Sequence, residues 1–388
     1  MLIEAQHDLG IPTWQDLSDL DHGHTEQLLR DALADESTAN ALCLITPDIE
    51  SSSVIARTEL PAIMRRIERR DGFFMVPVAA GGIGYADVPR VVGTYIGLHN
   101  LAEWNIHKAE TDPLSTIDAF EIARLIVKQR MIGIVRQLAP HAPLRLVLNT
   151  RKKPAFVPGV ALTLDWTHRF DGRMAQPPET WTRHLLPALE SVAQACETQA
   201  PGHSIVAEGL CSLPAAVALG TTFLATRRLS IAWQQVSPKR GPQLWSLAAS
   251  RETSAFFCNI LPADPSGDDL ALIVSVTSSV DPAFAALRPS LPKFRGLVVV
   301  AKSGDYPHDI ATAGQAVDVV QLILEGLRRA RADLQPRGTV HLFLAVPAGL
   351  AMMIGQVLNT FGPVQTYEHI GTDAVGTYHP AAVLHPSS

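Results

Sequence analysis

Two turns in the chain place small residues directly before a helix-forming segment. One turn lies in HSIVAEGLCSLPAAVALG and contains Gly209, Leu210, Cys211 and Ser212. The other lies in VHLFLAVPAGLAMMIGQVL and contains Val346, Pro347, Ala348, Gly349 and Leu350. Backbone N–H groups at a helix N-terminus can bind phosphate or base acceptor atoms, and small residues let a ligand approach closely. Both turns therefore suit an anionic ligand, although an ordinary strand–helix connection also needs small residues.

Hydroxyl and basic side chains follow other apolar segments. Thr277 and Ser278 come directly after IVSV, and the basic residues after two further segments are Arg151, Lys152, Lys153 and Lys302. Hydroxyl groups can add contacts to a phosphate, and the cations can balance its charge. The alternative for the basic residues is a solvated protein face.

A further candidate is the carboxylate of Glu59, which lies in ARTELPAI. Glu59 falls in a segment, residues 53–70, whose apolar residues recur at helical spacing. A fixed carboxylate can stabilise a positive charge that develops on a substrate. The alternative is a solvated helix residue.

Composition limits the classes of protein. The chain has 388 residues, 47% of them hydrophobic and 18% charged, which suits two or three buried domains. A formal net charge of −6 argues against a general nucleic-acid binder. No apolar run approaches the roughly 20 residues of a membrane span, and the N-terminus lacks the basic region of a signal peptide. Four scattered cysteines without metal spacing predict a cytoplasmic protein without a metal site.

The order of apolar and amphipathic segments predicts two α/β regions with parallel sheets. In the first region we expect strands at 41–47 and 73–78 and helices at 25–34, 53–70 and 117–138. In the second we expect strands at 143–149, 204–207, 229–234, 271–276, 296–301 and 339–346, and helices at 180–199, 214–225, 309–332 and 348–361. The two strand–turn–helix units above resemble each other, which indicates two related halves in the second region.

The segments GIPTWQDLSDLDHGHTEQLLRDAL, ANALCLITPDIESSSVIARTELPAI and FFMVPV resemble TIR domains in the order of their elements. The resemblance implies a flavodoxin-type parallel sheet over residues 1–139. It also implies an enzyme that cleaves NAD, with NAD as substrate and no cofactor. Glu59 would be the catalytic carboxylate. The residues that would line the NAD site or a contact between TIR domains are Trp14, Asp16, Asp19 and Ser53.

The NAD cleavage that this resemblance implies needs few catalytic side chains. Nicotinamide is already a cationic leaving group, so the fixed carboxylate only stabilises oxocarbenium-like charge on the ribose. One feature departs from the family, because MLIEAQHDLG resembles the tail of a first helix where TIR domains begin with a strand and loop. We therefore expect either a domain without its first strand or a start upstream of Met1. His22 and His24 lack a third ligand, so we expect no metal there.

Residues 140–388 resemble SAVED domains, which sense cyclic oligonucleotides in anti-phage systems. The resemblance rests on LTLDWTHRFDGR, HSIVAEGLCSLPAAVALGTTF, IAWQQ, IVSVTSSV and HLFLAVPAGLAMMIGQVLNTFGPVQTYEH with GTYHP. It implies two fused CARF-like Rossmann-type halves. It also implies that the turn residues, hydroxyls and lysines above bind a cyclic di- or trinucleotide as activator.

Together the resemblances predict an effector in which ligand binding drives head-to-tail self-association, completes composite TIR sites and hydrolyses NAD to nicotinamide and ADP-ribose. DNA and membranes are not expected partners. The alternative is a cyclic-oligonucleotide-binding module whose TIR-like unit is a non-catalytic scaffold. A further alternative, cleavage of the cyclic oligonucleotide itself, lacks a nucleophile–base pair in the sequence.

Overall fold

The computed structural model describes residues 1–11, 13, 25–35, 38–52, 54–88, 90–91, 105–153, 159–170, 174–237, 239–371 and 376–385. The chain forms two compact units. Unit 1 comprises Met1–Pro140 with the short segments Val157–Ala161 and Thr198–Ala200, and unit 2 comprises the remainder. Among the described helices, none is long and apolar enough to cross a membrane.

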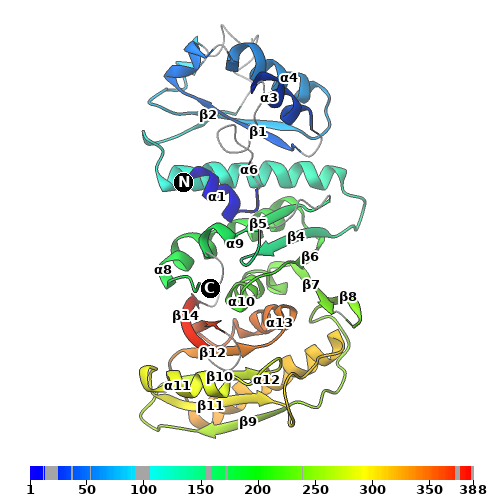
Figure 1. The fold of residues 1–388 in the computed structure, drawn as a ribbon, viewed down its shortest axis with the longest axis vertical. Coiled ribbons are helices and arrows are strands. Elements are labelled where there is room, and N and C mark those ends of the chain that lie inside the picture. Colours follow the sequence, from blue (N-terminus) through cyan, green and yellow to red (C-terminus); the bar gives the residue numbers. More distant parts are fainter. Residues whose placement is uncertain are drawn as a thin grey trace. The chain divides into compact units, whose positions relative to one another are not determined.

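Unit 1 contains a parallel sheet with helices on both faces (Figure 1). Its strands, in spatial order, are β1 (Asn40–Ile45), β2 (Phe74–Ala79) and β3 (His107–Lys108). Its helical segments are α1 (Leu2–Asp8), α3 (Thr25–Ala34), the 3-10 turn η1 (Pro47–Ser51), the π-turn η2 (Ile55–Glu59), α4 (Leu60–Glu68) and α6 (Thr116–Gln137). Helices α3 and α4 contact each other, and α4 and α6 both contact β2.

The faces of unit 1 follow from the apolar pattern of its elements. Ile63 of α4 packs with Phe73 and Met75 in one buried cluster. Ser115 is the N-cap of helix α6, and its hydroxyl accepts from the Asp118 N–H while the Asp118 carboxylate accepts from the Ser115 N–H. This reciprocal cap satisfies two N–H groups that a helix start leaves without partners. The buried residues of α6 are Asp118, Ala119, Ile122, Ala123, Ile126, Val127 and Met131.

The first half of unit 2 is a five-stranded sheet in the order β5-β4-β6-β7-β8. The strands are β4 (Leu144–Asn149), β5 (Leu162–Asp165), β6 (Ser204–Glu208), β7 (Ser230–Ser237) and β8 (Gly241–Trp245). Strands β5, β4, β6 and β7 are parallel, and β8 returns antiparallel to β7. The helical segments are α7 (Thr167–Phe170), α8 (Pro178–Thr180), η4 (Trp181–Leu185), α9 (Leu186–Gln199), α10 (Leu213–Thr222) and η5 (Ala225–Arg227).

The second half is a six-stranded sheet in the order β14-β13-β12-β10-β11-β9. The strands are β9 (Phe257–Pro262), β10 (Asp269–Ser275), β11 (Phe294–Ala301), β12 (Val340–Ala345), β13 (Val364–Ile370) and β14 (Thr377–Leu384). The four central strands are parallel, and the edge strands β9 and β14 are antiparallel to their neighbours. The helical segments are α11 (Asp281–Leu287), η6 (Arg288–Ser290), α12 (Ala313–Leu334) and α13 (Ala348–Leu358).

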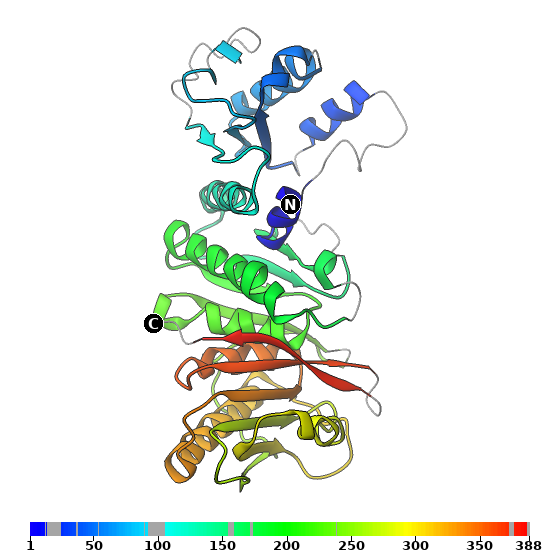
Figure 2. The same ribbon diagram turned by 90° about the vertical axis from the view of Figure 1, so that its left-hand side faces the viewer.

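Helices α10 and α13 cross between the two sheets of unit 2, as both ribbon views show (Figures 1 and 2). A Cβ atom on Gly220 of α10 would overlap the Met352 carbonyl oxygen, and one on Gly355 of α13 would overlap the Val217 carbonyl oxygen. The same number of residues separates Ser212 from Gly220 and Pro347 from Gly355. The crossing is therefore reciprocal and requires a glycine on each helix.

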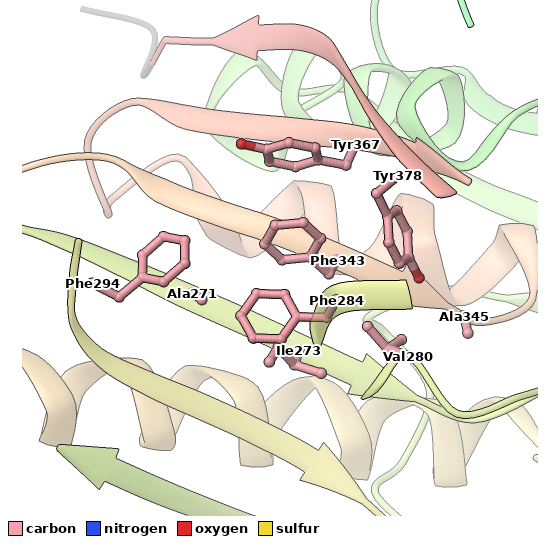
Figure 3. Packing of buried hydrophobic residues seen from close by; sticks show 9 residues of the cluster. All are labelled: Ala271, Ile273, Val280, Phe284, Phe294, Phe343, Ala345, Tyr367 and Tyr378. Carbon is pink, nitrogen blue, oxygen red and sulfur yellow. The ribbon is translucent and has the colours of Figure 1, made fainter. Parts of the chain in front are cut away.

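An aromatic cluster packs between the second sheet and helix α11 (Figure 3). Phe343 of β12 stacks on Tyr367 of β13 with ring centroids 4.3 Å apart, and Phe284 of α11 meets Phe343 edge to face at 4.9 Å. The Tyr378 hydroxyl donates to the Leu344 carbonyl, so this buried phenol keeps a hydrogen bond.

The predicted α/β class with Rossmann-type halves is confirmed, and so are the principal predicted strands and helices. Three details differ or extend it. The helix expected at 53–70 is divided, because the π-turn η2 precedes α4 and Pro61 lies in the first turn of α4. Strands β5, β8, β9 and β14 were not predicted as separate elements. Of the TIR-like segment that begins with GIPTWQD, residues 12 and 14–24 fall outside the described residues.

Candidate functional site

In each half of unit 2, the strand order reverses at one point, between β4 and β6 and between β10 and β12. From β4 the chain goes first to β5 on one side and then to β6 on the other, and from β10 it goes first to β11 and then to β12. In open α/β sheets, ligands bind beside the carboxyl ends of the strands at such a reversal. The predicted turns 209–212 and 346–350 each follow one of these strands.

At the first reversal, the ends of β4 and β6 are held together by backbone contacts. The Leu210 carbonyl accepts from the N–H groups of Thr150 and Arg151, and the Asn149 side chain accepts from the Leu210 N–H at 2.6 Å. Gly209 has φ +137°, and a Cβ there would overlap the Leu148 carbonyl oxygen. Only glycine suits this conformation and this close approach.

Ser212 caps the N-terminus of α10 at the same reversal. Its side chain accepts from the Ala215 N–H, and its own N–H donates to the Thr150 hydroxyl at 2.8 Å. The residues after β4 and the helix that follows β6 are therefore joined directly.

The second reversal repeats this arrangement. The Ala345 carbonyl at the end of β12 accepts from the N–H groups of Val276 and Thr277, which follow β10. The Ser275 hydroxyl accepts from the Val280 N–H and holds the loop that contains Thr277 and Ser278. Helix α13 begins at this edge with Pro347 as its N-cap.

Each helix N-terminus also meets a side chain from the other half. At α13, the Gly349 N–H donates to the Gln235 side-chain oxygen at 3.2 Å, and a Cβ on Gly349 would press on Trp233 and Trp245. At α10, Ser212 lies close to the Glu368 carboxylate of β13. Each helix start therefore contacts the other half of unit 2, α13 through the Gly349 N–H and α10 through its N-cap residue Ser212.

Glu368 forms an ion pair with Arg151, which lies just past β4. Glu368 is only 3% exposed, and burial raises the pKa of its carboxyl, whereas Arg151 and the Ser212 hydroxyl act to lower that pKa. Burial also raises the pKa of the neighbouring Cys211 thiol to about 12, with the Glu368 charge as a smaller cause. Cys211 is therefore a neutral thiol rather than a nucleophile at neutral pH.

The predicted ligand residues differ in what they can offer. Those whose side chains are buried are Ser212, Val346 and Leu350. Val346 and Leu350 lie in the hydrophobic core, so they offer a ligand only their backbone. The exposed residues at the same edges are Lys152, Lys153, Gly209, Leu210 and Thr277. Half-buried Lys302 follows β11, one strand away from the reversal, and its carbonyl lies 3.1 Å from the His308 ring Nε2.

In unit 1, Glu59 is the last residue of the π-turn η2 and is half-buried. Its charge acts on Cys43 of β1, because the pKa of the Cys43 thiol is raised to about 11 by burial and, as a smaller cause, by Glu59. The carboxylate is therefore close to the sheet rather than on an outward face of the helix. The predicted residues Trp14, Asp16, Asp19 and Ser53 lie outside the described residues, as do His22 and His24.

Within the described ranges, no three His, Cys, Asp or Glu side chains gather closely enough to hold a metal ion.

Sequence reasoning did not select Gln235 or Glu368. Both are polar residues in the carboxyl-terminal half of a strand, β7 (SIAWQQVS) and β13 (VQTYEHI). That position is a usable signal, because the ends of parallel strands share one edge. The partner of each residue lies in the other half, and no spacing in the sequence indicates that pairing.

Residues 188–384 match the family model of SAVED, the SMODS-associated and fused to various effectors sensor domain. The chain belongs to the SAVED family. No curated protein matches the sequence.

Among solved structures, this SAVED chain is similar to the Acinetobacter baumannii Cap4 SAVED/CARF-domain containing receptor with the cyclic trinucleotide 2′3′3′-cAAA. The TM-score is 0.52 at 14% identity, over 93% of this chain and 97% of that chain. The same receptor with 3′3′3′-cAAA gives a TM-score of 0.50 at 14% identity, over 84% of this chain and 85% of that chain. At this identity the likeness shows the fold.

Proposed function

We propose that this SAVED protein is an anti-phage sensor whose unit 2 binds a cyclic oligonucleotide at the carboxyl edges of its two sheets. The observation that carries the proposal is the pairing of two strand-order reversals, each with a helix N-terminus, in a chain of the SAVED family. Backbone N–H groups there can donate hydrogen bonds to phosphate oxygens or base acceptor atoms, and Lys152 and Lys153 lie exposed beside the first reversal. Similar receptor structures hold cyclic trinucleotides.

The binding test is calorimetry with 2′3′3′-cAAA, 3′3′3′-cAAA and cyclic dinucleotides, with linear triadenylate as control. We expect one cyclic compound to bind and the linear compound to bind more weakly, because the closed ring is already ordered. Failure of every cyclic di- and trinucleotide to bind would contradict the proposal.

We further propose that unit 1 is a TIR-like NAD glycohydrolase with Glu59 as its catalytic carboxylate. The support is the order of the TIR-like motifs and the half-buried position of Glu59 beside β1. A partly desolvated carboxylate stabilises positive charge more strongly than one in water, so this position suits an oxocarbenium-like ribose.

The enzymatic test measures nicotinamide release from NAD by the purified protein with and without the bound cyclic oligonucleotide. We expect release only with ligand and a loss of at least about 100-fold in Glu59→Gln. Glu68→Gln, at the exposed end of α4, is the matched control and should remain active. If the chain binds ligand but Glu59→Gln and wild type are equally inactive, unit 1 is the non-catalytic scaffold of the alternative function.

A further inference from the structure

The Arg151–Glu368 pair is an unusual contact between the two halves of unit 2. Arg151 follows β4 in the first half, and Glu368 lies in β13 of the second. The pair uses Arg151 Nη2 and Glu368 Oε1. The remaining atoms, Arg151 Nη1 and Glu368 Oε2, are buried, and neither has a hydrogen-bond partner of normal geometry within 3.5 Å among the residues that the structure describes.

Such an incomplete pair is a poor way to stabilise a fold. A buried ion pair repays its desolvation only when the remaining donors and acceptors are also satisfied. Within the described part of the chain, a guanidinium N–H of Arg151 lacks an acceptor, and an oxygen of the buried Glu368 carboxylate lacks a donor. The arrangement leaves Arg151 able to accept a better-matched anion.

The surroundings indicate the chemistry of that anion. Arg151 lies at the β4/β6 reversal, where the Leu210 carbonyl fixes its backbone and helix α10 begins. A guanidinium matches a phosphate with two parallel hydrogen bonds, and a helix N-terminus favours negative charge. The Glu368 carboxylate already places one anion beside Ser212, the N-cap residue of α10. Two anions there would repel each other, so the position suits one at a time.

We propose that Arg151 anchors a phosphodiester of the cyclic oligonucleotide and that Glu368 is a built-in competitor which the ligand displaces. This inference rests on the proposed ligand binding and adds a residue-level switch to it. Because the Arg151–Glu368 contact joins the two halves, its exchange for an Arg151–phosphate contact transmits ligand binding to β13.

Displacement of the Glu368 carboxylate by the ligand should be coupled to proton uptake. Glu368 already has a raised pKa through burial, and losing Arg151 removes a group that lowers it. The displaced carboxyl therefore takes up a proton, and ligand affinity increases as pH falls. The other titratable groups near Glu368 are Cys211 before α10, Tyr378 and His379 on β14, and His369 on its own strand. If proton uptake on ligand binding is lost in Glu368→Gln, the proton belongs to this carboxyl.

The test is titration calorimetry of the full chain with the tightest-binding member of the cyclic panel, at several pH values and in two buffers of different ionisation enthalpy. For Glu368→Gln we expect an affinity for the ligand that is several-fold higher at neutral pH. Proton uptake on binding should be lost, and so should the part of the pH dependence of affinity that comes from this carboxyl. For Arg151→Met we expect an affinity for the ligand that is at least about tenfold lower. The affinity of Arg151→Lys should lie between that of Arg151→Met and that of the wild type, because lysine keeps the positive charge but lacks the two parallel N–H donors of the guanidinium.

The matched control is Asp318→Asn, which breaks a different buried carboxylate–arginine pair of unit 2, with Arg251. It should leave affinity and proton uptake unchanged. If Glu368→Gln weakens binding as Arg151→Met does, the pair is merely structural and the inference is overturned. If the wild-type chain binds no cyclic oligonucleotide, the proposed function itself fails, and this inference fails with it.

Discussion

At the scale of single residues, Arg66 of α4 holds the connection between α3 and β1. It is 4% exposed, and its guanidinium donates to the carbonyls of Leu33 and Asp35 at 2.8 and 2.7 Å and pairs with Asp71 at 2.5 Å. The guanidinium also lies over the Phe73 ring. One buried cation thus satisfies carbonyls at the end of α3 that would otherwise lack donors.

Arg66→Met should destabilise unit 1 by about 3 kcal/mol, because it leaves these carbonyls and Asp71 without their partner. Arg65→Met, at the exposed neighbouring position, should change stability by less than about 0.5 kcal/mol. Urea unfolding followed by circular dichroism measures both. Equal effects of the two substitutions would show that the Arg66 contacts contribute little.

The sequence does not distinguish Arg66 from Arg65, since both belong to one predicted helix. The same limit applies to Glu368, which the sequence shows only as one residue of the SAVED-like motif ending in QTYEH. In both cases the residue type was visible, but its partners come from distant segments that only the fold brings together. The turns at 209–212 and 346–350 were predictable because strand, turn and helix are adjacent in the chain.

At the scale of elements, the α10–α13 crossing decides how the two halves of unit 2 meet. The duplicated Ala-rich helices were visible in the sequence, but their glycines had no assigned purpose. In the structure, each glycine leaves room for a backbone carbonyl of the other helix. Strands β8, β9 and β14 were harder to predict: GPQLW begins like a turn, and β9 and β14 lie at sheet edges, where several positions are exposed.

Gly220→Ala and Gly355→Ala should each destabilise unit 2 by about 1–3 kcal/mol, because the new methyl group overlaps backbone of the other helix. The double variant should cost less than the sum, since one separation of the helices relieves both overlaps. Gly133→Ala in α6 is the control: among the described residues, its Cβ would meet the Gly72 carbonyl oxygen alone, at an ordinary 3.5 Å. Helix propensity should then stabilise it by up to about 1 kcal/mol.

At the scale of the whole molecule, the α/β class with parallel sheets that the sequence predicts is the class that the structure contains. The alternation of apolar and amphipathic segments was sufficient for this prediction, because parallel strands and their crossover helices alternate along the chain. The order of strands within each sheet was not predictable. That order creates the two reversals, and it explains why residues after β4 and β6, or after β10 and β12, share a site.

The TIR-like and SAVED resemblances imply that ligand binding drives head-to-tail self-association, and we propose this assembly for the chain. A ligand that binds the assembled form more tightly shifts the equilibrium toward it, and the assembly in turn tightens ligand binding. In sedimentation velocity, the wild-type chain should form larger species as the cyclic oligonucleotide is added, at a ligand concentration that falls with rising protein concentration. Glu59→Gln should assemble like the wild type, because its change lies in the proposed chemistry, whereas Arg151→Met should need more ligand. NAD cleavage by a chain that stays monomeric with ligand bound would contradict the composite-site model and leave a site complete within one chain.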